Sequence, residues 1–512
     1  MNFRVFIRLL GTVINLLVGS MLLSLLWSGW EYHLSGSLAD KNALVAMALS
    51  IAIGGVFGAI LFFCGKWSKK IDRKTAFLLV SACWFVGAGI GALPFYIWSL
   101  ISYDILGSST EFLSYINCYF EAMSGLTTTG ASILNNIEAL PRGILFWRAQ
   151  IQWLGGLGIV VLFVAVLPSI GSGNKKLFQA ETTGFSNDSD APKIQGMARQ
   201  LWLIYLGITM LEAFILRFTD PSIDWFRAIT FSFSTAATAG FSVLNESAGP
   251  IAASSQWVLS IFMFLAGINY ALYYKTIHKK RWAVFQDTEF RGYAAIVAGA
   301  SLLIFLSIYG TPYLGMHQEA ISSDAFKAAT DATFQVISIQ TTTGFSNVDS
   351  NSWPLFTQLI LLGLMFIGGC AGSTGGGIKV SRIMAAFKII LRHIEKVYRP
   401  KVVRPLRMGS TIISDAQANG ILIHITFIFL LSFFSTMLIA AVEPNLDFMT
   451  ALSASVSSLN NIGPGFSSVG ATGNYFDFSN FSKLWFSFLM VTGRLEIFTI
   501  VVMFFPKFWQ DA

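Results

Sequence analysis

Long apolar segments alternate with short polar ones along most of this chain. Nine of them lie at about residues 3–29, 42–64, 75–100, 146–168, 200–218, 257–274, 293–309, 420–442 and 481–505, and a tenth, interrupted one begins near Pro354. An α-helix rises about 1.5 Å per residue, so about 20 apolar residues span the hydrocarbon core of a bilayer. The pattern therefore predicts an all-α polytopic membrane protein with ten transmembrane helices, two of which precede a repeated unit.

Four shorter, mixed stretches lie between pairs of these spans, at residues 111–125, 224–236, 323–338 and 447–459. Each is too short to cross the bilayer, and each ends in a small polar loop that contains glycine. Helix, half-helix, loop and helix, in this order, are typical of a re-entrant pore module. Such a half-helix points its C-terminal carbonyls, which carry a partial negative charge, toward a cation in the pore.

The four glycine loops are similar to one another. They contain Thr-Thr-Thr-Gly at 127–130, Ala-Thr-Ala-Gly at 237–240, Thr-Thr-Thr-Gly at 341–344 and Asn-Asn-Ile-Gly at 460–463, and the successive glycines are 110, 104 and 119 residues apart. One such loop on its own is an ordinary turn between helices. Four loops at nearly equal spacing indicate four copies of one structural module.

The residue types of these loops favour cation binding through the backbone. Irregular backbone at membrane depth is tolerated where it is packed in protein or lines a watery cavity, and rings of carbonyl oxygens replace the hydration shell of K⁺ in potassium channels. We therefore expect the loops to form a cation filter around one axis. The candidate filter residues are Thr128, Thr129, Gly130, Thr238, Ala239, Gly240, Thr342, Thr343, Gly344, Asn461, Ile462 and Gly463. Because the second and fourth loops differ from the other two, the ring is not four-fold symmetric.

The repeat divides the chain into five parts. Residues 1–74 hold the two leading helices and a basic linker. The four pore modules are expected to occupy residues 75–175, 176–285, 286–400 and 401–512.

Composition and charge support the membrane class and predict the orientation. Of the 512 residues, 54% are hydrophobic and 12% are charged, which argues against a water-soluble protein. Basic residues gather at 66–74, 275–291 and 379–407, whereas residues 101–111, 311–324 and 443–447 contain no Lys or Arg. The positive-inside rule therefore predicts that both termini and the basic loops are cytoplasmic. We expect packed thiols, since no CxxC spacing occurs among Cys64, Cys83, Cys118 and Cys370.

A glycine-rich stretch interrupts the span after the third loop. Residues 368–377 contain six glycines, and each interior glycine costs a helix about 1 kcal/mol relative to alanine. We expect an unwound intramembrane loop below the filter that gates the pore, built from Gly368, Gly369, Gly372, Gly375, Gly376 and Gly377. Two alternatives stay open: a phosphate-binding loop, disfavoured because Lys379 does not directly follow a glycine, and a helix face packed through small residues.

Arg494 is the ionisable residue of greatest interest. It lies near the middle of the last span, and charged residues inside a membrane are costly enough that a function is expected. If it lines the pore, we expect it to act with the gate as a fixed positive barrier to K⁺. If it pairs with an acid such as Glu496, it holds helices together.

Other ionisable residues of the spans have more ordinary interpretations. Glu121 and Asp331 lie in half-helices, where they pair with Arg148, lower the potential of the outer pore, or make structural hydrogen bonds. Glu212 and His424 have no ligand spacing around them, so we expect helix contacts.

The loops around Gly130, Gly240, Gly344 and Gly463, the glycine-rich break and Arg494 together resemble the Trk/Ktr/HKT superfamily of potassium transporters, over about residues 75–505. The two additional N-terminal helices resemble the bacterial TrkH/TrkG branch rather than the shorter KtrB branch. The resemblance implies that the four glycines belong to a K⁺ selectivity filter. It also implies that the glycine-rich break is the gate and that Arg494 is the arginine characteristic of the family's last span.

The same resemblance implies a cellular setting. It predicts potassium uptake across a bacterial inner membrane, with K⁺ as the transported ion and no organic cofactor in this chain. It further predicts a homodimer with one pore per protomer. The predicted partner is a cytoplasmic ring of TrkA-like RCK/KTN regulatory subunits, which bind nucleotide and control the gate.

A secondary transporter that couples K⁺ to H⁺ or Na⁺ is the alternative function. Alternating access of that kind requires inverted repeats and titratable groups at the midplane. Here the four repeats run in the same orientation and their loops carry no carboxylate, which favours a pore. An enzyme is not expected, since the sequence has no cluster of nucleophile and base and no HExxH-type site.

Overall fold

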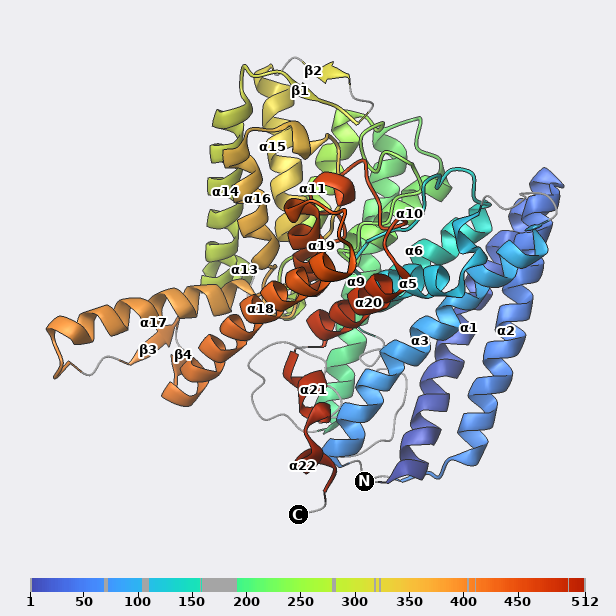
Figure 1. Ribbon diagram of the computed structural model, residues 1–512, viewed down its shortest axis with the longest axis horizontal. Helices are drawn as coiled ribbons and strands as arrows, with labels where there is room; N and C mark the ends of the chain where they lie inside the picture. The colour runs from blue at the N-terminus through green and yellow to red at the C-terminus, as the bar shows by residue number, and fades with distance from the viewer. Residues whose placement is uncertain are drawn as a thin grey trace.

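The computed structural model describes residues 2–68, 72–103, 110–156, 158, 191–278, 282–316, 319–321, 324–402, 405–409, 411–495 and 497–510. This part of the chain is mainly helical, with two small antiparallel hairpins, and the prediction of an all-α polytopic membrane fold is confirmed. Long helices form the outside of the molecule, and short helices with irregular loops fill its centre (Figure 1).

Three long N-terminal helices lie side by side at one flank of the molecule (Figure 1). They are α1 (Phe3–Ser35), α2 (Leu38–Cys64) and α3 (Arg73–Ile101). Gly36, in the left-handed conformation at φ 63°, ends α1, and the Ser37 side chain caps α2 by accepting the Asp40 N–H. The outward side of α2 exposes large apolar side chains such as Phe63, which suits a helix that contacts lipid.

Four short helices lie in the centre of the molecule, where the half-helices were predicted. They are α5 (Tyr115–Leu126), α10 (Trp225–Ala236), α15 (Ala325–Gln340) and α19 (Phe448–Asn460). Aspartate side chains cap the last three of these, because Asp224, Asp324 and Asp447 each accept the backbone N–H three residues on. A single 3-10 turn, η2 (Glu111–Leu113), precedes α5.

The outer helices of the modules surround this centre. In chain order they are α6 (Arg142–Gly156), α9 (Ala191–Thr219), α11 (Ala253–Ala266), α12 (Tyr270–His278), α14 (Thr288–Ile308), α16 (Leu355–Phe366), α17 (Val380–Tyr398), α18 (Asp415–Val442), α20 (Asn480–Arg494) and α21 (Ile497–Val501). Helices α17 and α18 extend away from the bundle together (Figure 1). The β3–β4 hairpin joins them, with Leu406 opposite Ile413.

Short elements complete the described chain. They are the helices α13 (Ala283–Gln286) and α22 (Pro506–Trp509), the 3-10 turns η3 (Ser350–Ser352), η4 (Ser467–Val469) and η5 (Val502–Phe504), and the strands β1 (Tyr313–Leu314), β2 (Ala320–Ile321), β3 (Leu406–Met408) and β4 (Thr411–Ile413).

Two of the predicted spans contain a break. Helices α11 and α12 are bent by 89° relative to each other, because the Gly267 carbonyl bonds to Cys370 N of another segment and the Asn269 side chain starts a new helix by accepting Ala271 N. The last span is also a bent pair: α20 ends at Arg494, and α21 follows it. The predicted spans at 257–274 and 481–505 therefore each consist of two helices with a bend between them.

The predicted count of ten spans stays a prediction. Among the described residues, six helices are long and apolar enough to cross a membrane, or eight if each bent pair is one span. The other two predicted spans are incomplete. Helix α6 ends at Gly156, and most of the rest of that predicted span lies outside the described residues, while α16 ends at Phe366, before the glycine-rich stretch.

Candidate functional site

The backbone of the four glycine loops alternates between ordinary and left-handed conformations. Thr128, Thr238, Thr342 and Asn461 have φ of 56°, 51°, 59° and 56°, and the glycine two residues after each also has positive φ, between 77° and 104°. In an extended strand the carbonyl groups of successive residues point to opposite sides. A left-handed conformation at every second residue therefore turns the carbonyls of successive residues toward the same side. Positive φ at β-branched threonine is rare and marks a functional site when the surroundings enforce it.

The four loops contact one another in a closed ring. A side chain at Gly130 would overlap the carbonyl oxygen of Ala239, and in the same way Gly240 faces Thr343, Gly344 faces Ile462, and Gly463 faces Thr129. Each glycine therefore lies against a carbonyl of the next module, which belongs to the residue just before that module's own glycine. The glycine of the fourth loop contacts the first loop in the same way, so the ring is closed. Only glycine permits an approach this close between backbones.

A serine on each half-helix holds its loop in place. The carbonyls of Ser124, Ser234, Ser338 and Ser457 accept the N–H of the residue before the glycine, at 2.8, 2.9, 2.9 and 3.1 Å. Each serine lies six residues before its glycine. This recurring serine is a signal in the sequence for the filter loops, although the predicted filter residues did not include it.

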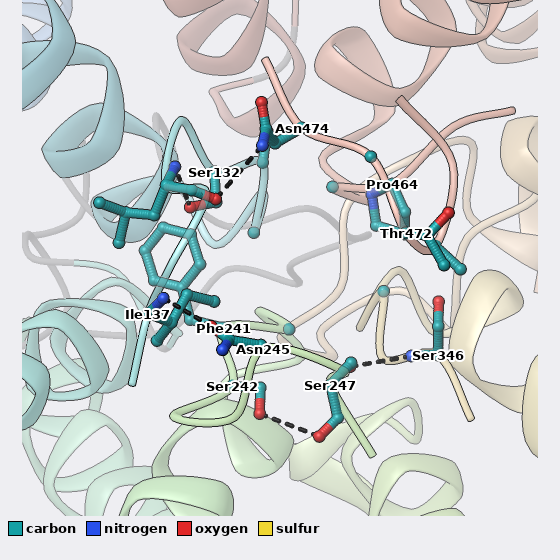
Figure 2. A pocket seen from close by; sticks show the side chains of 18 of the residues that line it. Ser132, Ile137, Phe241, Ser242, Asn245, Ser247, Ser346, Pro464, Thr472 and Asn474 are labelled. Carbon is teal, nitrogen blue, oxygen red and sulfur yellow. Dashed lines mark hydrogen bonds between the residues drawn. The ribbon is translucent and has the colours of Figure 1, made fainter. Parts of the chain in front are cut away.

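An open cavity of about 130 Å³ lies against one side of the ring (Figure 2). All four glycines line it, together with polar groups of the loops that follow them, including Ser132, Ser242, Ser346 and Asn474. Backbone and hydroxyl oxygens thus face the space directly in front of the ring. The cavity suits a small hydrated cation better than an apolar ligand.

Glu121 and Arg148 form a buried ion pair beside this cavity. The Arg148 Nε lies 2.6 Å from Glu121 Oε1, and both side chains are at most 2% exposed. Arg148 also donates to Ser242 O at 2.7 Å, while Glu121 accepts Ile133 N at 3.0 Å. The pair therefore joins the first loop region to the second, and the predicted pairing of Glu121 with Arg148 is confirmed.

Asp331 is held by structural hydrogen bonds, as one of its interpretations predicted. Its carboxylate accepts bonds from Tyr313 at 2.6 Å, Asn347 at 2.7 Å and Lys327 at 3.0 Å. These contacts fix α15 to the segments on either side of the third loop.

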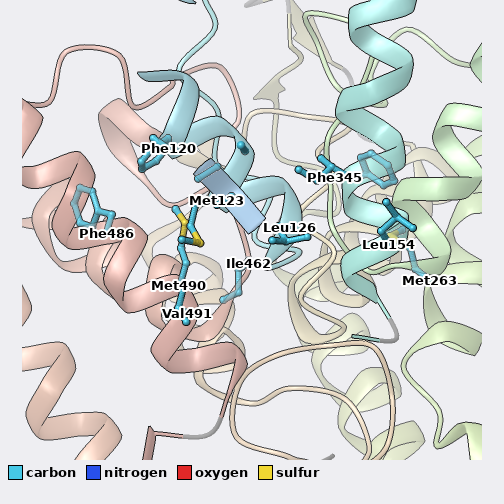
Figure 3. Close-up of a cluster of buried hydrophobic side chains, with 14 of the residues drawn as sticks. Phe120, Met123, Leu126, Leu154, Met263, Phe345, Ile462, Phe486, Met490 and Val491 are labelled. Carbon is cyan, nitrogen blue, oxygen red and sulfur yellow. The ribbon is translucent and has the colours of Figure 1, made fainter. Parts of the chain in front are cut away.

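Amide side chains support the second and fourth loops, which lack the Thr-Thr-Thr sequence. Gln152 of α6 donates to Ala239 O at 2.7 Å and accepts the Ser234 hydroxyl. Asn461 donates to Thr129 Oγ1 at 3.0 Å and to Met490 O at 2.8 Å. Behind these contacts, apolar side chains of α5 and α20, such as Met123 and Met490, pack tightly (Figure 3). Gln152 was not among the predicted site residues, although an amide inside an apolar span is visible in the sequence.

The glycine-rich stretch forms a non-helical loop between α16 and α17. Residues Ile367 and Ile378 make an isolated parallel bridge, with Gly368 N bonded to Ile378 O at 2.7 Å, and this closes the base of the loop. The alternative of a small-residue helix face is therefore wrong. The phosphate-loop alternative is also disfavoured, since Lys379 Nζ is buried and donates to Gly375 O at 2.7 Å.

This loop lies against the ring formed by the four glycine loops, on the side of the half-helix C-termini. Gly376 N donates to the Thr342 hydroxyl at 2.8 Å, and the Thr374 hydroxyl lies 3.2 Å from the Thr238 hydroxyl. A side chain at Gly376 would overlap Asn460 O, so the loop fits closely under the fourth loop as well. Its residues thus contact three of the four predicted filter loops.

Arg494 connects this loop to the first module. From the end of α20, one guanidinium nitrogen donates to Thr374 O, and another donates to Gly155 O at 2.7 Å and to Gly156 O. The neighbouring acid Glu496 lies outside the described residues, so a pairing with it stays untested. The hydrogen bonds that the guanidinium makes to described residues go to backbone carbonyls.

Glu289, at the start of α14, links the glycine-rich loop to the first turn of α17. Its Oε1 accepts Ala371 N at 2.8 Å and Ser381 N at 2.9 Å. The sequence did not mark this residue as functional, because the first turn of a helix is an ordinary place for an acid.

The remaining predicted residues take simpler places. His424 Nε2 lies 2.9 Å from an Arg382 nitrogen between α17 and α18, and Glu212 is fully buried on α9. Cys64 is exposed at the end of α2, so the prediction of a packed thiol was wrong there, whereas the other three cysteines are buried. No group of three metal-ligating side chains occurs within the described ranges.

Comparisons with known proteins agree on one family. The sequence model of the TrkH family, described as a cation transport protein, matches residues 40–511. The chain is 34% identical to the Trk system potassium uptake protein TrkH of Salmonella typhimurium and 33% identical to that of Escherichia coli K12, in each case over all of both chains. It is also similar to the crystal structure of the potassium transporter TrkH from Vibrio parahaemolyticus, with a TM-score of 0.84 and 29% identity over all of both chains.

Proposed function

The chain belongs to the TrkH family of cation transport proteins, and from this we propose that it takes up K⁺ across a bacterial inner membrane through a pore. The filter of this pore is the ring of the four glycine loops, from Thr128, Thr129 and Gly130 in the first module to Asn461, Ile462 and Gly463 in the fourth. Both termini are cytoplasmic. The boundaries of the four modules are those predicted from the repeat, beginning at residues 75, 176, 286 and 401.

The closed contact of the four loops supports this function most directly. Each glycine packs against a carbonyl of the next module, and left-handed residues alternate along every loop. We infer from these features that carbonyl oxygens surround one axis, which is the arrangement that replaces water around K⁺. The four half-helices direct their C-terminal partial charges to the same place. No single loop could supply these features alone.

The glycine-rich loop is the gate of the proposed pore. It contacts Thr342 and Thr238, next to the filter, so an ion leaving the filter meets the loop first. Arg494 holds it to the first module through Thr374 O, which keeps the loop across the ion path. A guanidinium stays charged at all accessible pH values, so Arg494 also repels K⁺ at this point.

Regulatory subunits control the gate of the proposed pore. We propose a homodimer with one pore per protomer and a TrkA-like RCK/KTN ring on the cytoplasmic face. Movement of α17, which directly follows the glycine-rich loop and carries many basic residues, is the simplest route from such a ring to the gate.

Transport of K⁺ coupled to H⁺ or Na⁺ is the second candidate function. Glu212 favours it, because a fully buried carboxyl on α9 is the kind of titratable group that coupling requires. The filter loops themselves carry no carboxylate.

Flux measurements on the purified protein in liposomes separate the two candidates. We expect K⁺ to flow down its own gradient, with equal rates in the presence and absence of a pH or Na⁺ gradient. A K⁺ flux that requires one of those gradients would establish the coupled transporter. If neither the wild type nor a variant lacking residues 372–377 carried K⁺, the proposed function would be wrong.

A further inference from the structure

The carbonyl oxygens of the four glycines have different surroundings. Gly463 O accepts a hydrogen bond from the Ser457 hydroxyl at 2.9 Å and a second one from the Tyr475 hydroxyl at 3.0 Å. A carbonyl oxygen has two lone pairs, so both acceptor positions of Gly463 O are occupied. Within the described ranges, the carbonyls of Gly130, Gly240 and Gly344 accept no hydrogen bond from the protein.

The residue after the glycine accounts for the difference from the second and third loops. Ser234 and Ser338 occupy the same place on their half-helices as Ser457, but their hydroxyls bond to the carbonyl of the phenylalanine after the glycine, at 2.6 Å in both cases. In the fourth loop that next residue is Pro464, and proline restricts the backbone of the residue before it. Gly463 has φ of 104°, against 77° to 82° for the other three glycines. Its own carbonyl, rather than that of Pro464, therefore accepts the serine hydroxyl.

Tyr475 is firmly positioned to hold this carbonyl. Its side chain is 2% exposed, and its N–H donates to Ser132 O of the first module at 2.9 Å. Its ring packs against Phe478 and Phe120, with centroids 5.6 and 5.5 Å away. The ring is consequently held by residues of two modules, which places the hydroxyl beside Gly463 O.

We propose that Tyr475 is a specificity-determining residue of the pore. Together with Ser457 it holds the Gly463 carbonyl away from the ion, so that three carbonyls instead of four coordinate K⁺ at the glycine layer. This inference rests on the proposed function of the loops as a K⁺ filter. The glycine layer borders the outer cavity, whose water completes the shell of the ion there. Na⁺ retains water more strongly than K⁺, so an incomplete ring excludes Na⁺ less well than a complete one.

Removal of the hydroxyl tests this role. Tyr475→Phe keeps the ring and its packing but removes one of the two donors, and a second variant adds Pro464→Ala to free the backbone as well. We expect the K⁺ over Na⁺ permeability ratio, measured from reversal potentials in liposomes, to rise slightly in the single variant and at least about threefold in the double variant. The matched control is Tyr273→Phe, which removes a hydroxyl that bonds to the Leu265 carbonyl of α11 instead of a filter carbonyl, and its ratio should equal that of the wild type.

The outcomes separate this inference from the proposed function. The permeability ratio is a property of conducting molecules and does not depend on the yield of folded protein. If neither the wild type nor the variant lacking residues 372–377 conducts K⁺, the proposed function fails. If the wild type is selective for K⁺ and both Tyr475 variants leave the ratio unchanged or lower it, the hydroxyl merely stiffens the filter and the present inference is overturned.

Discussion

Arg494→Ala is expected to open the pore. The guanidinium joins Thr374 O of the glycine-rich loop to Gly155 O and Gly156 O of the first module. When the loop moves aside, the bond to Thr374 O breaks, while the bonds to the first module can persist. One hydrogen bond from a charged donor contributes about 1.5–3 kcal/mol, which corresponds to a shift of about 10- to 150-fold in the ratio of open to closed gates.

The assay is the rate of K⁺ flux per folded molecule in liposomes, without regulatory partner. Arg494→Ala should raise this rate at least about tenfold if the wild-type gate is mostly closed. The flux of Arg494→Lys should lie between that of the wild type and that of the alanine variant. One ammonium group cannot reach both Thr374 O and Gly155 O, whereas the planar guanidinium bonds to both through different nitrogens. Arg392→Ala, which removes a charge from α17 that pairs with Asp415, is the matched control and should leave the rate unchanged.

One result would refute this reasoning. Suppose that Arg494→Ala and Arg494→Lys both reduce the yield of folded protein and leave the flux per molecule at the wild-type value. Arg494 is then a structural link and does not hold the gate closed. A lower flux in the alanine variant would contradict both proposed roles of Arg494, holding the gate closed and repelling K⁺.

Three further changes test the neighbouring contacts. Deletion of Gly372 to Gly377 should increase K⁺ flux and reduce its dependence on the regulatory partner, and a folded deletion variant that conducts no faster would count against a blocking loop. Glu289→Gln should loosen the link between the same loop and α17, since a neutral amide accepts the two N–H groups less strongly than a carboxylate, and faster hydrogen exchange at residues 371–381 with a higher flux would demonstrate it. Arg148→Met should destabilise the protein by about 3–5 kcal/mol, because it leaves the Glu121 charge buried and unpaired, and adding Glu121→Gln should restore much of the loss in thermal unfolding.

The helical membrane architecture was predictable because membrane insertion leaves strong marks in a sequence. A half-helix such as α5 is visible as a stretch too short to span, and the glycines recur because close backbone contact excludes any side chain at Gly130 or Gly344. The loss of helix at residues 368–377 followed from glycine content alone. These features depend on local amino-acid composition, so a single sequence is enough to detect them.

The parts that were missed depend on contacts between distant residues. The bend between α11 and α12 arises because Gly267 O bonds to Cys370, and one glycine in an apolar span does not predict a break. Gln152 makes a hydrogen bond to a residue 87 positions away in the sequence, and Glu289 makes one to a residue 92 positions away. Both residue types are ordinary for their positions. The described hydrogen bonds of Arg494 go to backbone carbonyls, which are present at every residue and leave no mark in the sequence.

The reversal potential of Gly344→Ser in mixed K⁺ and Na⁺ tests the filter most directly. Gly344 has φ of 82°, and a side chain there would overlap Ile462 O and lie 2.8 Å from Pro464 Cδ, so serine must displace the carbonyl ring. The control is Gly363→Ser on α16, where a side chain would meet no atom within 4 Å. We predict that the wild type and the control prefer K⁺ and that Gly344→Ser loses most of this preference. An unchanged reversal potential in a conducting Gly344→Ser protein would contradict the assignment of the four loops as the K⁺ filter.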